Sequence, residues 1–177
     1  MSPARRRTAR RRRVNAGPAK KKRVESDYAP EYSYRDGVLF GLCLPLALAP
    51  TMNVYASAES WKRAIWRKNV DAQILLALRN IRPMAKVRYP ARHKEINEAM
   101  HGAGLGATER RRVVVTRYSS REPDDIAIDI IGGKVALDRL KQCGLLVDDN
   151  RQWCQREALW RKAPPRFGYV EIEVMGV

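Results

Sequence analysis

Carboxylates gather in one stretch of a chain that is otherwise strongly basic. The protein has 177 residues, with 35 Lys and Arg against 19 Asp and Glu, so its formal net charge is +16. Within residues 124–149, six acidic residues stand against three basic ones, which gives this window a net charge of −3. Clustered carboxylates repel one another and repel DNA unless a cation lies between them. Mg2+ prefers carboxylate oxygens and keeps open water positions, which suits the hydrolysis of a phosphodiester.

Each acidic residue of this window also has a purely structural interpretation. Asp124 and Asp125 follow a proline and are typical of a turn, and Asp129 is a candidate helix N-cap. Lys134, Asp138 and Lys141 stand at offsets of zero, four and seven, which is also the pattern of a solvated stripe of ion pairs on a helix. Asp148-Asp149-Asn150 is typical of a turn. Spacing alone leaves the metal site and the structural interpretation open.

Segment 121–150 resembles the signature of the RusA-like Holliday junction resolvases, a family common in phages and prophages. That signature is an Asp-x-Asp-Asn pair, a Lys, an Asp four residues later, a Gly-hydrophobic stretch and an Asp-Asp pair. The residues that match it in order and spacing are Lys134, Asp138, Gly144-Leu145-Leu146 and Asp148-Asp149, preceded by Gly132-Gly133. Upstream, Leu48-Ala49-Pro50-Thr51-Met52-Asn53 resembles the family's first-strand Pro-x-x-Asn element. The resemblance spans about residues 37–177.

The resemblance implies a homodimer that uses Mg2+, or alternatively Mn2+, to nick two symmetric strands of a four-way DNA junction. Asp149 matches a metal-binding and catalytic Asp, Lys134 the catalytic Lys, and Asp125 the first Asp of the leading pair. The further metal candidates of the window are Asp124, Asp138 and Asp148.

The second Asp and the Asn of the leading pair are replaced by Ala127 and Ile128, and the nearest carboxylate is Asp129. Either Asp129 takes the metal-binding place from a shifted backbone, or the protein is a DNA-binding protein that kept the fold and lost the site.

The excess positive charge lies mainly at the N-terminus. Residues 1–24 hold 11 basic residues and no acid, and their apolar content is too low to offset the entropy of ordering them. We expect a disordered arm over 1–36 that contacts DNA phosphates. A nuclear-import signal and a solubilising tail are the alternatives. The candidate phosphate contacts of the arm are Arg10, Arg11, Arg12, Arg13, Lys20, Lys21, Lys22 and Arg23.

The first half of the remaining chain predicts a strand and a helix. The apolar run 38–49 fits a buried strand, because acids precede it, Pro45 interrupts it and it is too short to span a bilayer; an export signal is the alternative. A helix capped by Ser57 or Ser60 should run to about Arg79. Its residues Trp61, Ile65, Ala72 and Leu76 share one face. Its cations Lys62, Arg63, Arg67 and Lys68 are either a solvated face or a surface that tracks DNA.

The second half predicts the rest of an α+β domain over 37–177. Residues 80–110 should form a flexible connection that carries both histidines, His93 and His101, on the surface. A strand at 110–118, a helix over 130–142 closed by Gly144, and strands at 153–161 and 169–174 follow. In the last strand, Val170, Ile172 and Val174 should point inward and Glu171 and Glu173 outward. We therefore expect a small mixed sheet of about four strands packed with two main helices.

Cysteine usage indicates the compartment. Cys43, Cys143 and Cys154 have neither a disulfide framework nor metal-ligand spacing, which favours a reducing environment. We expect a protein of the bacterial or phage-infected cytoplasm, with a nuclear location as the alternative and no membrane partner.

Overall fold

The computed structural model describes residues 29–81, 93–129 and 132–177 as a mixed α+β fold, which confirms the expected fold class. The basic residues expected to bind DNA within the arm, and Ile130 of the expected helix, lie outside the described residues. The elements in chain order are β1 Val38–Pro45, α1 Met52–Ser57, α2 Ser60–Ile81, α3 His93–Gly102, β2 Arg111–Ser119, α4 Lys134–Gln142, β3 Cys154–Lys162 and β4 Tyr169–Gly176.

The four strands form one sheet in the order β1-β4-β2-β3. β4 runs antiparallel to both β1 and β2, whereas β3 runs parallel to β2. A parallel pair needs a crossover connection, and α4 with its flanking loops supplies it. The last two strands therefore do not pair with each other, because β2 lies between them.

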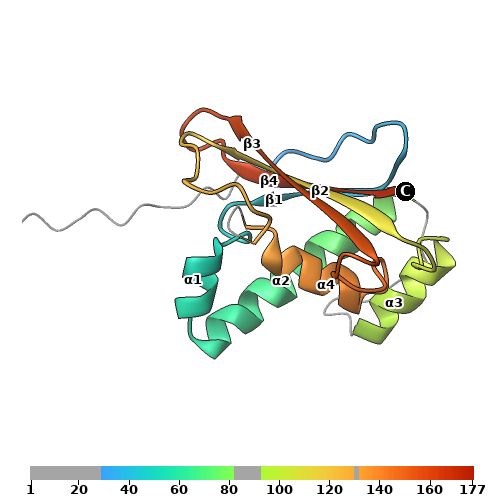
Figure 1. Cartoon of the computed structure of the whole chain (residues 1–177). Coiled ribbons are helices and arrows are strands. Elements are labelled where there is room, and N and C mark those ends of the chain that lie inside the picture. Colours follow the sequence, from blue (N-terminus) through green and yellow to red (C-terminus); the bar gives the residue numbers. More distant parts are fainter. Residues whose placement is uncertain (1–28, 82–92, 130–131) are drawn as a thin grey trace, which may run out of the picture.

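All the helices labelled in Figure 1 cover one face of the sheet, and the segment before β1 crosses the other face. The helix-facing side chains of β4 are Val170, Ile172 and Val174, and all three are fully buried as expected. They join Ile74 and Leu78 of α2 in one hydrophobic core. The alternation of the last strand thus fixes which face the helices cover.

The buried face of α2 differs from the expected one. Trp61, Ile65 and Leu76 are 56%, 48% and 49% exposed, and the buried residues are Val70, Asp71, Ile74, Leu75 and Leu78. All the buried residues of α2 therefore lie in its C-terminal part, and before Val70 the helix contributes the partly buried Trp66 to the core. α2 carries apolar residues on more than one side, and periodicity alone selected the wrong row.

The expected irregular connection over 80–110 is wrong for residues 93–102, which form α3. Ile96 and Met100, four residues apart, are fully buried and anchor this helix. Two buried apolar residues in a ten-residue helix do not produce a hydrophobic periodicity that can be recognised in the sequence. His101 is exposed, as expected of a surface histidine.

The helix α4 begins at Lys134 rather than at residue 130, and it ends where expected. Gly144 adopts a left-handed conformation with φ of +79°. The Leu145 N–H donates to the Leu140 carbonyl at 3.0 Å, which is the bond of a Schellman C-cap. The prediction of Gly144 as the helix terminator is confirmed.

The far face of the sheet is covered by residues 29–36, which were expected to belong to the arm. Glu171 and Glu173 point to this face, as predicted, but they are only 6% and 8% exposed. The Tyr32 hydroxyl donates to Glu173 at 2.6 Å, and the Arg35 guanidinium lies 3.0 Å from Glu171 and 3.2 Å from Glu173. Residues 29–36, which we call the strap, therefore bury the two glutamates and supply Arg35 as the cation that pairs with them.

Candidate active site

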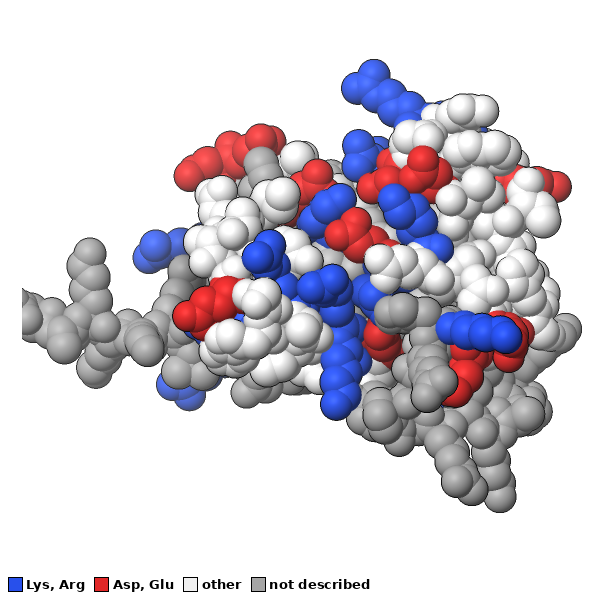
Figure 2. Space-filling model, turned by 90° about the horizontal axis from the view of Figure 1, so that it is seen from below, with Lys and Arg blue, Asp and Glu red and all other residues white. Residues whose placement is uncertain are grey.

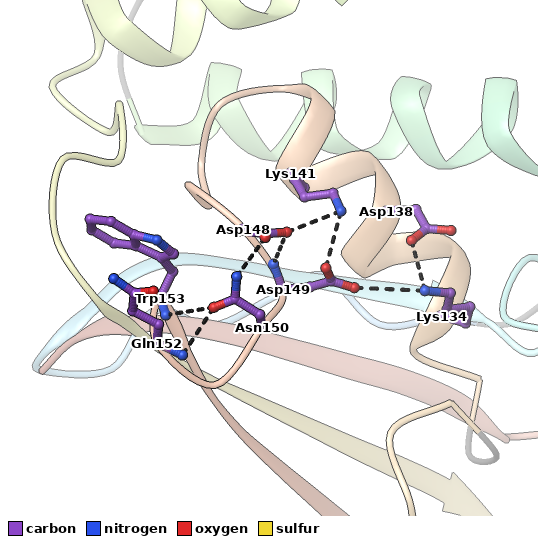
Figure 3. A network of polar contacts seen from close by, with 8 residues as sticks. All are labelled: Lys134, Asp138, Lys141, Asp148, Asp149, Asn150, Gln152 and Trp153. Carbon is purple, nitrogen blue, oxygen red and sulfur yellow. Dashed lines mark hydrogen bonds and ion pairs between the residues drawn. The ribbon is translucent and has the colours of Figure 1, made fainter.

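α4 and the turn after it bring five charged residues together (Figure 3). The Lys134 ammonium lies 3.0 Å from Asp138, one helical turn away, and 3.7 Å from Asp149. The Lys141 ammonium lies 3.2 Å from Asp148 and 3.0 Å from Asp149. Each oxygen of Asp149 thus faces one lysine, and the stripe of ion pairs expected on the helix extends into the following turn.

The turn at residues 148–150 is held by its own side chains. The Asp149 N–H donates to Asp148 Oδ1 at 2.8 Å, and Asn150 Nδ2 donates to Asp148 Oδ2 at 2.6 Å. Asn150 Oδ1 in turn accepts from the N–H groups of Gln152 and Trp153 at 3.0 and 3.3 Å. These bonds account for the turn interpretation of this segment, and they leave the Asp149 side chain directed at α4.

Two glycines place Lys134 at the first position of α4. Gly132 has φ of +103°, and a side chain there would overlap the Ala49 carbonyl. A side chain on Gly133 would meet Ile128, whose carbonyl accepts the Gly133 N–H at 2.8 Å. Only glycine allows this close approach of the loop to Ala49, which lies in the turn after β1.

The charges of the site shift its pKa values in opposite directions. The hydrogen bond from Lys141, aided by Asp148 and the charge of Lys134, lowers the pKa of Asp149 to about 2 despite partial burial. Partial burial works to lower the pKa of Lys134. The hydrogen bond and charge of Asp138, with the charges of Asp129 and Asp149, raise it. These contributions outweigh the effect of burial, so the net shift of the pKa is upward. At neutral pH both groups are therefore charged.

Asp129 supplies a third carboxylate whose charge reaches Lys134. Its Oδ1 is buried and accepts no hydrogen bond. It is not the N-cap of α4, a position held by Gly133. Asp124 and Asp125 are exposed in the loop before it, and no hydrogen bond or ion pair joins either to Lys134 or Asp149 within the described segments.

Asp129 and Asp149 carry carboxylate oxygens, the type of ligand that a hard divalent cation prefers. Nowhere in the described residues do three or more His, Cys, Asp or Glu side chains form a group that could hold a metal ion. Mg2+ does not require such a cage, because it is usually held by one or two carboxylates with waters and substrate phosphates. The unpartnered oxygen of Asp129 is a donor of that kind, whereas both oxygens of Asp149 already face lysine ammonium groups.

A groove beside Asp129 was not foreseen from the sequence. It has a volume of about 460 Å3 and lies between the loop at 126–129 and the start of β3. Its polar lining residues are Arg110, Asp129, Arg151, Gln155 and Arg156. The three arginines are scattered over 47 positions of sequence, so only the fold brings them together.

The expected DNA-tracking cations of α2 lie in its first three turns. Lys62 is 3.8 Å from Glu59, and Arg63 lies over the Tyr55 ring at 6.0 Å. The Arg67 side chain donates to the Arg63 carbonyl, and Lys68 is exposed. Figure 2, a view from below onto the helix-covered face, shows Lys and Arg interspersed with Asp and Glu.

Comparisons with known proteins do not assign a family to the chain. No protein-family model matches the sequence, and no curated protein matches it at a significant level. Within the described residues, no helix is both long enough and apolar enough to cross a membrane.

Proposed function

We propose that this protein is a divalent-metal-dependent endonuclease that cuts branched DNA. The observation that carries the proposal is the meeting of Asp129, Lys134 and Asp149 at the start of α4. One of these carboxylates has a buried oxygen without a partner, and the other is held ionised by two lysines. Metal-dependent phosphodiester hydrolysis uses carboxylates beside a cation of this kind.

Each residue has a defined role in the proposed reaction. Asp129 and Asp149 would hold Mg2+ or Mn2+, which when bound polarises a phosphoryl oxygen and supplies hydroxide. Lys134 would stabilise the negative charge that develops on the scissile phosphate. Asp138 orients that ammonium from 3.0 Å, and Lys141 holds Asp149 from 3.0 Å. Asp138 and Lys141 are thus positioning residues.

The resemblance to RusA-like resolvases supports branched DNA as the substrate and a homodimer as the active form. A four-way junction presents two symmetric strands, and a twofold dimer presents two equivalent sites to them. The exposed row of Trp61, Ile65 and Leu76 on α2 supplies apolar surface for an interface between two copies. The cytoplasm of a bacterial or phage-infected cell fits such a substrate.

The test is cleavage of a labelled synthetic four-way junction in the presence of Mg2+. We expect the wild type to cut the junction and EDTA to abolish cutting. Asp149→Asn should lower the rate by about 100-fold or more, because it removes a charged ligand of the cation. Glu122→Gln is the matched control, since Glu122 is an exposed carboxylate of the same loop region and should leave the rate unchanged.

Cutting that persists in EDTA would contradict the proposal, as would an Asp149→Asn variant that cuts at the wild-type rate. Circular dichroism of each variant separates loss of chemistry from loss of fold.

A second candidate function is junction or duplex binding without catalysis. It is favoured by Ile128, which occupies a position where the family pattern has Asn and is only 6% exposed within the hydrophobic core. It is also favoured by the two lysines that already neutralise Asp149. Calorimetry distinguishes the two functions: salt-dependent DNA binding with no heat of Mg2+ binding would support the second.

A further inference from the structure

The three arginines of the groove beside β3 are free of carboxylate partners. Arg110, Arg151 and Arg156 are exposed, and within the described segments none of them forms an ion pair. Other arginines of the fold are engaged: Arg112 lies 2.5 Å from Glu157, and Arg139 lies 2.6 Å from Asp71. Three unpaired guanidinium groups around one hollow repel one another unless an anion joins them.

The groove includes one carboxylate of the proposed active site. Asp129 lines it directly, and so does Cys154 at the start of β3. Burial raises the pKa of the Cys154 thiol, Arg156 and Arg110 lower it, and Asp149 raises it. Charges from both the groove and the acidic site therefore act on this one side chain.

The lining has the chemistry of a nucleic-acid backbone site. Guanidinium groups bind phosphate oxygens in a bidentate manner, and Gln155 adds an amide that can donate to phosphate or sugar. Ile126, Ala127 and Ala158 add apolar surface to the lining, which sugar rings can contact. A single free phosphate would need only one or two of these arginines, whereas a groove of about 460 Å3 accommodates a length of backbone.

We propose that this groove binds the phosphate backbone of one DNA strand and leads it to Asp129 and Asp149. The identity of the strand as DNA rests on the proposed function. The groove differs from the arm and from the cations of α2, which were the contacts expected from the sequence. It would give the site a specific path for the strand, whereas the arm supplies attraction at longer range.

The test is the salt dependence of DNA binding by the full chain in EDTA, where no metal-dependent cutting occurs. Fluorescence anisotropy with a labelled four-way junction and a linear duplex gives the slope of log affinity against log salt concentration. The double variant Arg151→Gln/Arg156→Gln should make the slope shallower by about two, because each lost phosphate contact removes about one unit. Thermal unfolding should be unchanged, since both side chains are exposed.

The matched control is Arg161→Gln/Lys162→Gln, which removes the same charge from exposed positions at the other end of β3. We expect its slope to stay close to the wild-type value. Equal effects in the two double variants, or no effect in the groove variant, would overturn the proposal.

The failure of this proposal and the failure of the nuclease proposal have different signatures. A wild type that never cuts DNA but shows the groove-specific slope change would retain the groove and lose the nuclease. A wild type that cuts with Mg2+ but binds with the same slope in the groove variant would retain the nuclease and lose the groove.

Discussion

The carboxylate of Asp149 is held between two lysine ammonium groups, at 3.0 Å from Lys141 and 3.7 Å from Lys134. Asp129 lies within electrostatic reach of the same Lys134 and keeps one buried oxygen without a partner. Both oxygens of Asp149 therefore have a partner, whereas one oxygen of Asp129 has none. A cation bound between substrate and protein would give the unpartnered oxygen of Asp129 a partner.

The lowered pKa of Asp149 makes a prediction about stability at acid pH. The group titrates near 3.8 when unfolded and near 2 when folded, so its contribution to stability is complete above about pH 4. As pH falls from 4 to 2, the unfolded chain binds the proton first and that contribution is lost. Urea denaturation of wild type and Asp149→Asn should therefore give stability curves that converge as pH falls through this range. A constant difference between them would contradict the account.

At the scale of elements, a buried ion pair joins the two main helices. Both guanidinium nitrogens of Arg139 that face Asp71 donate to its carboxylate, at 2.6 and 2.7 Å. Arg139 is 2% exposed and Asp71 is 8% exposed. Arg139 also donates to Gln142 in the last turn of α4. This contact sets how α4, and with it Lys134, lies against α2.

Removing one partner of this pair should be strongly destabilising. Asp71→Ala leaves the Arg139 charge buried, and we expect a loss of about 3–5 kcal/mol in the free energy of unfolding. The double variant Asp71→Leu/Arg139→Met should recover most of that loss, because no buried charge remains. Urea denaturation measures both. Glu98→Ala is the control, since its exposed pair with Lys94 at 3.8 Å should contribute less than about 1 kcal/mol.

The strap over the far face of the sheet makes a prediction about a carboxyl whose pKa is raised rather than lowered. Burial raises the pKa of Glu171 although Arg35 opposes the shift. Arg35→Ala should raise it further and destabilise the fold by about 1–3 kcal/mol at pH 8. A carboxyl with a raised folded pKa costs stability as pH rises above its unfolded value of 4.5, so the loss should shrink toward pH 4.5. Denaturation at the two pH values measures the difference.

A loss that is the same at both pH values would contradict this interpretation of the strap. Lys94→Ala is the matched control, because it removes an exposed cation whose ion-pair partner, Glu98, is itself exposed, and it should be nearly neutral.

The sequence predicted those elements whose signals are local. The alternation of Val170, Ile172 and Val174 marks a half-buried strand, and Gly144 marks a helix end, because both depend on neighbouring residues alone. The grouping of Lys134 with Asp149 was also predictable, since a short helix and one turn join them. The burial of Glu171 and Glu173 was not, because Glu171 is paired with Arg35 and Glu173 with Tyr32, more than 130 residues away in sequence. The grouping of the groove arginines was not predictable either, because Arg110 is distant in sequence from Arg151 and Arg156.

At the scale of the whole molecule, positive charge is divided between the N-terminal 24 residues, which hold 11 basic side chains, and a domain of mixed charge. Figure 2 shows both signs on the helix-covered face. The proposed strand path therefore does not follow the largest concentration of charge. It follows the three unpaired arginines that lead to Asp129.

The exposed apolar row on α2 makes a prediction about assembly. We expect the chain of 20.2 kDa to elute as a dimer of about twice that mass in light scattering coupled to chromatography. Trp61→Ser/Ile65→Ser should shift it to the monomer, because it removes large apolar side chains from the exposed face. Met52→Ser, an exposed apolar residue on α1, is the comparison. A wild type that is monomeric at high concentration would contradict the dimer.

The most direct measurement is the rate at which Asp129→Asn cuts a four-way junction at saturating Mg2+ and saturating DNA. Asp129 is the residue that must replace the family's second Asp, so its charge is the least replaceable part of the proposed site. We predict that the wild type cuts and that the rate of Asp129→Asn falls by about 100-fold or more, with junction affinity in EDTA unchanged. An Asp129→Asn rate equal to that of the wild type, or no cutting by either protein, would contradict the proposed active site.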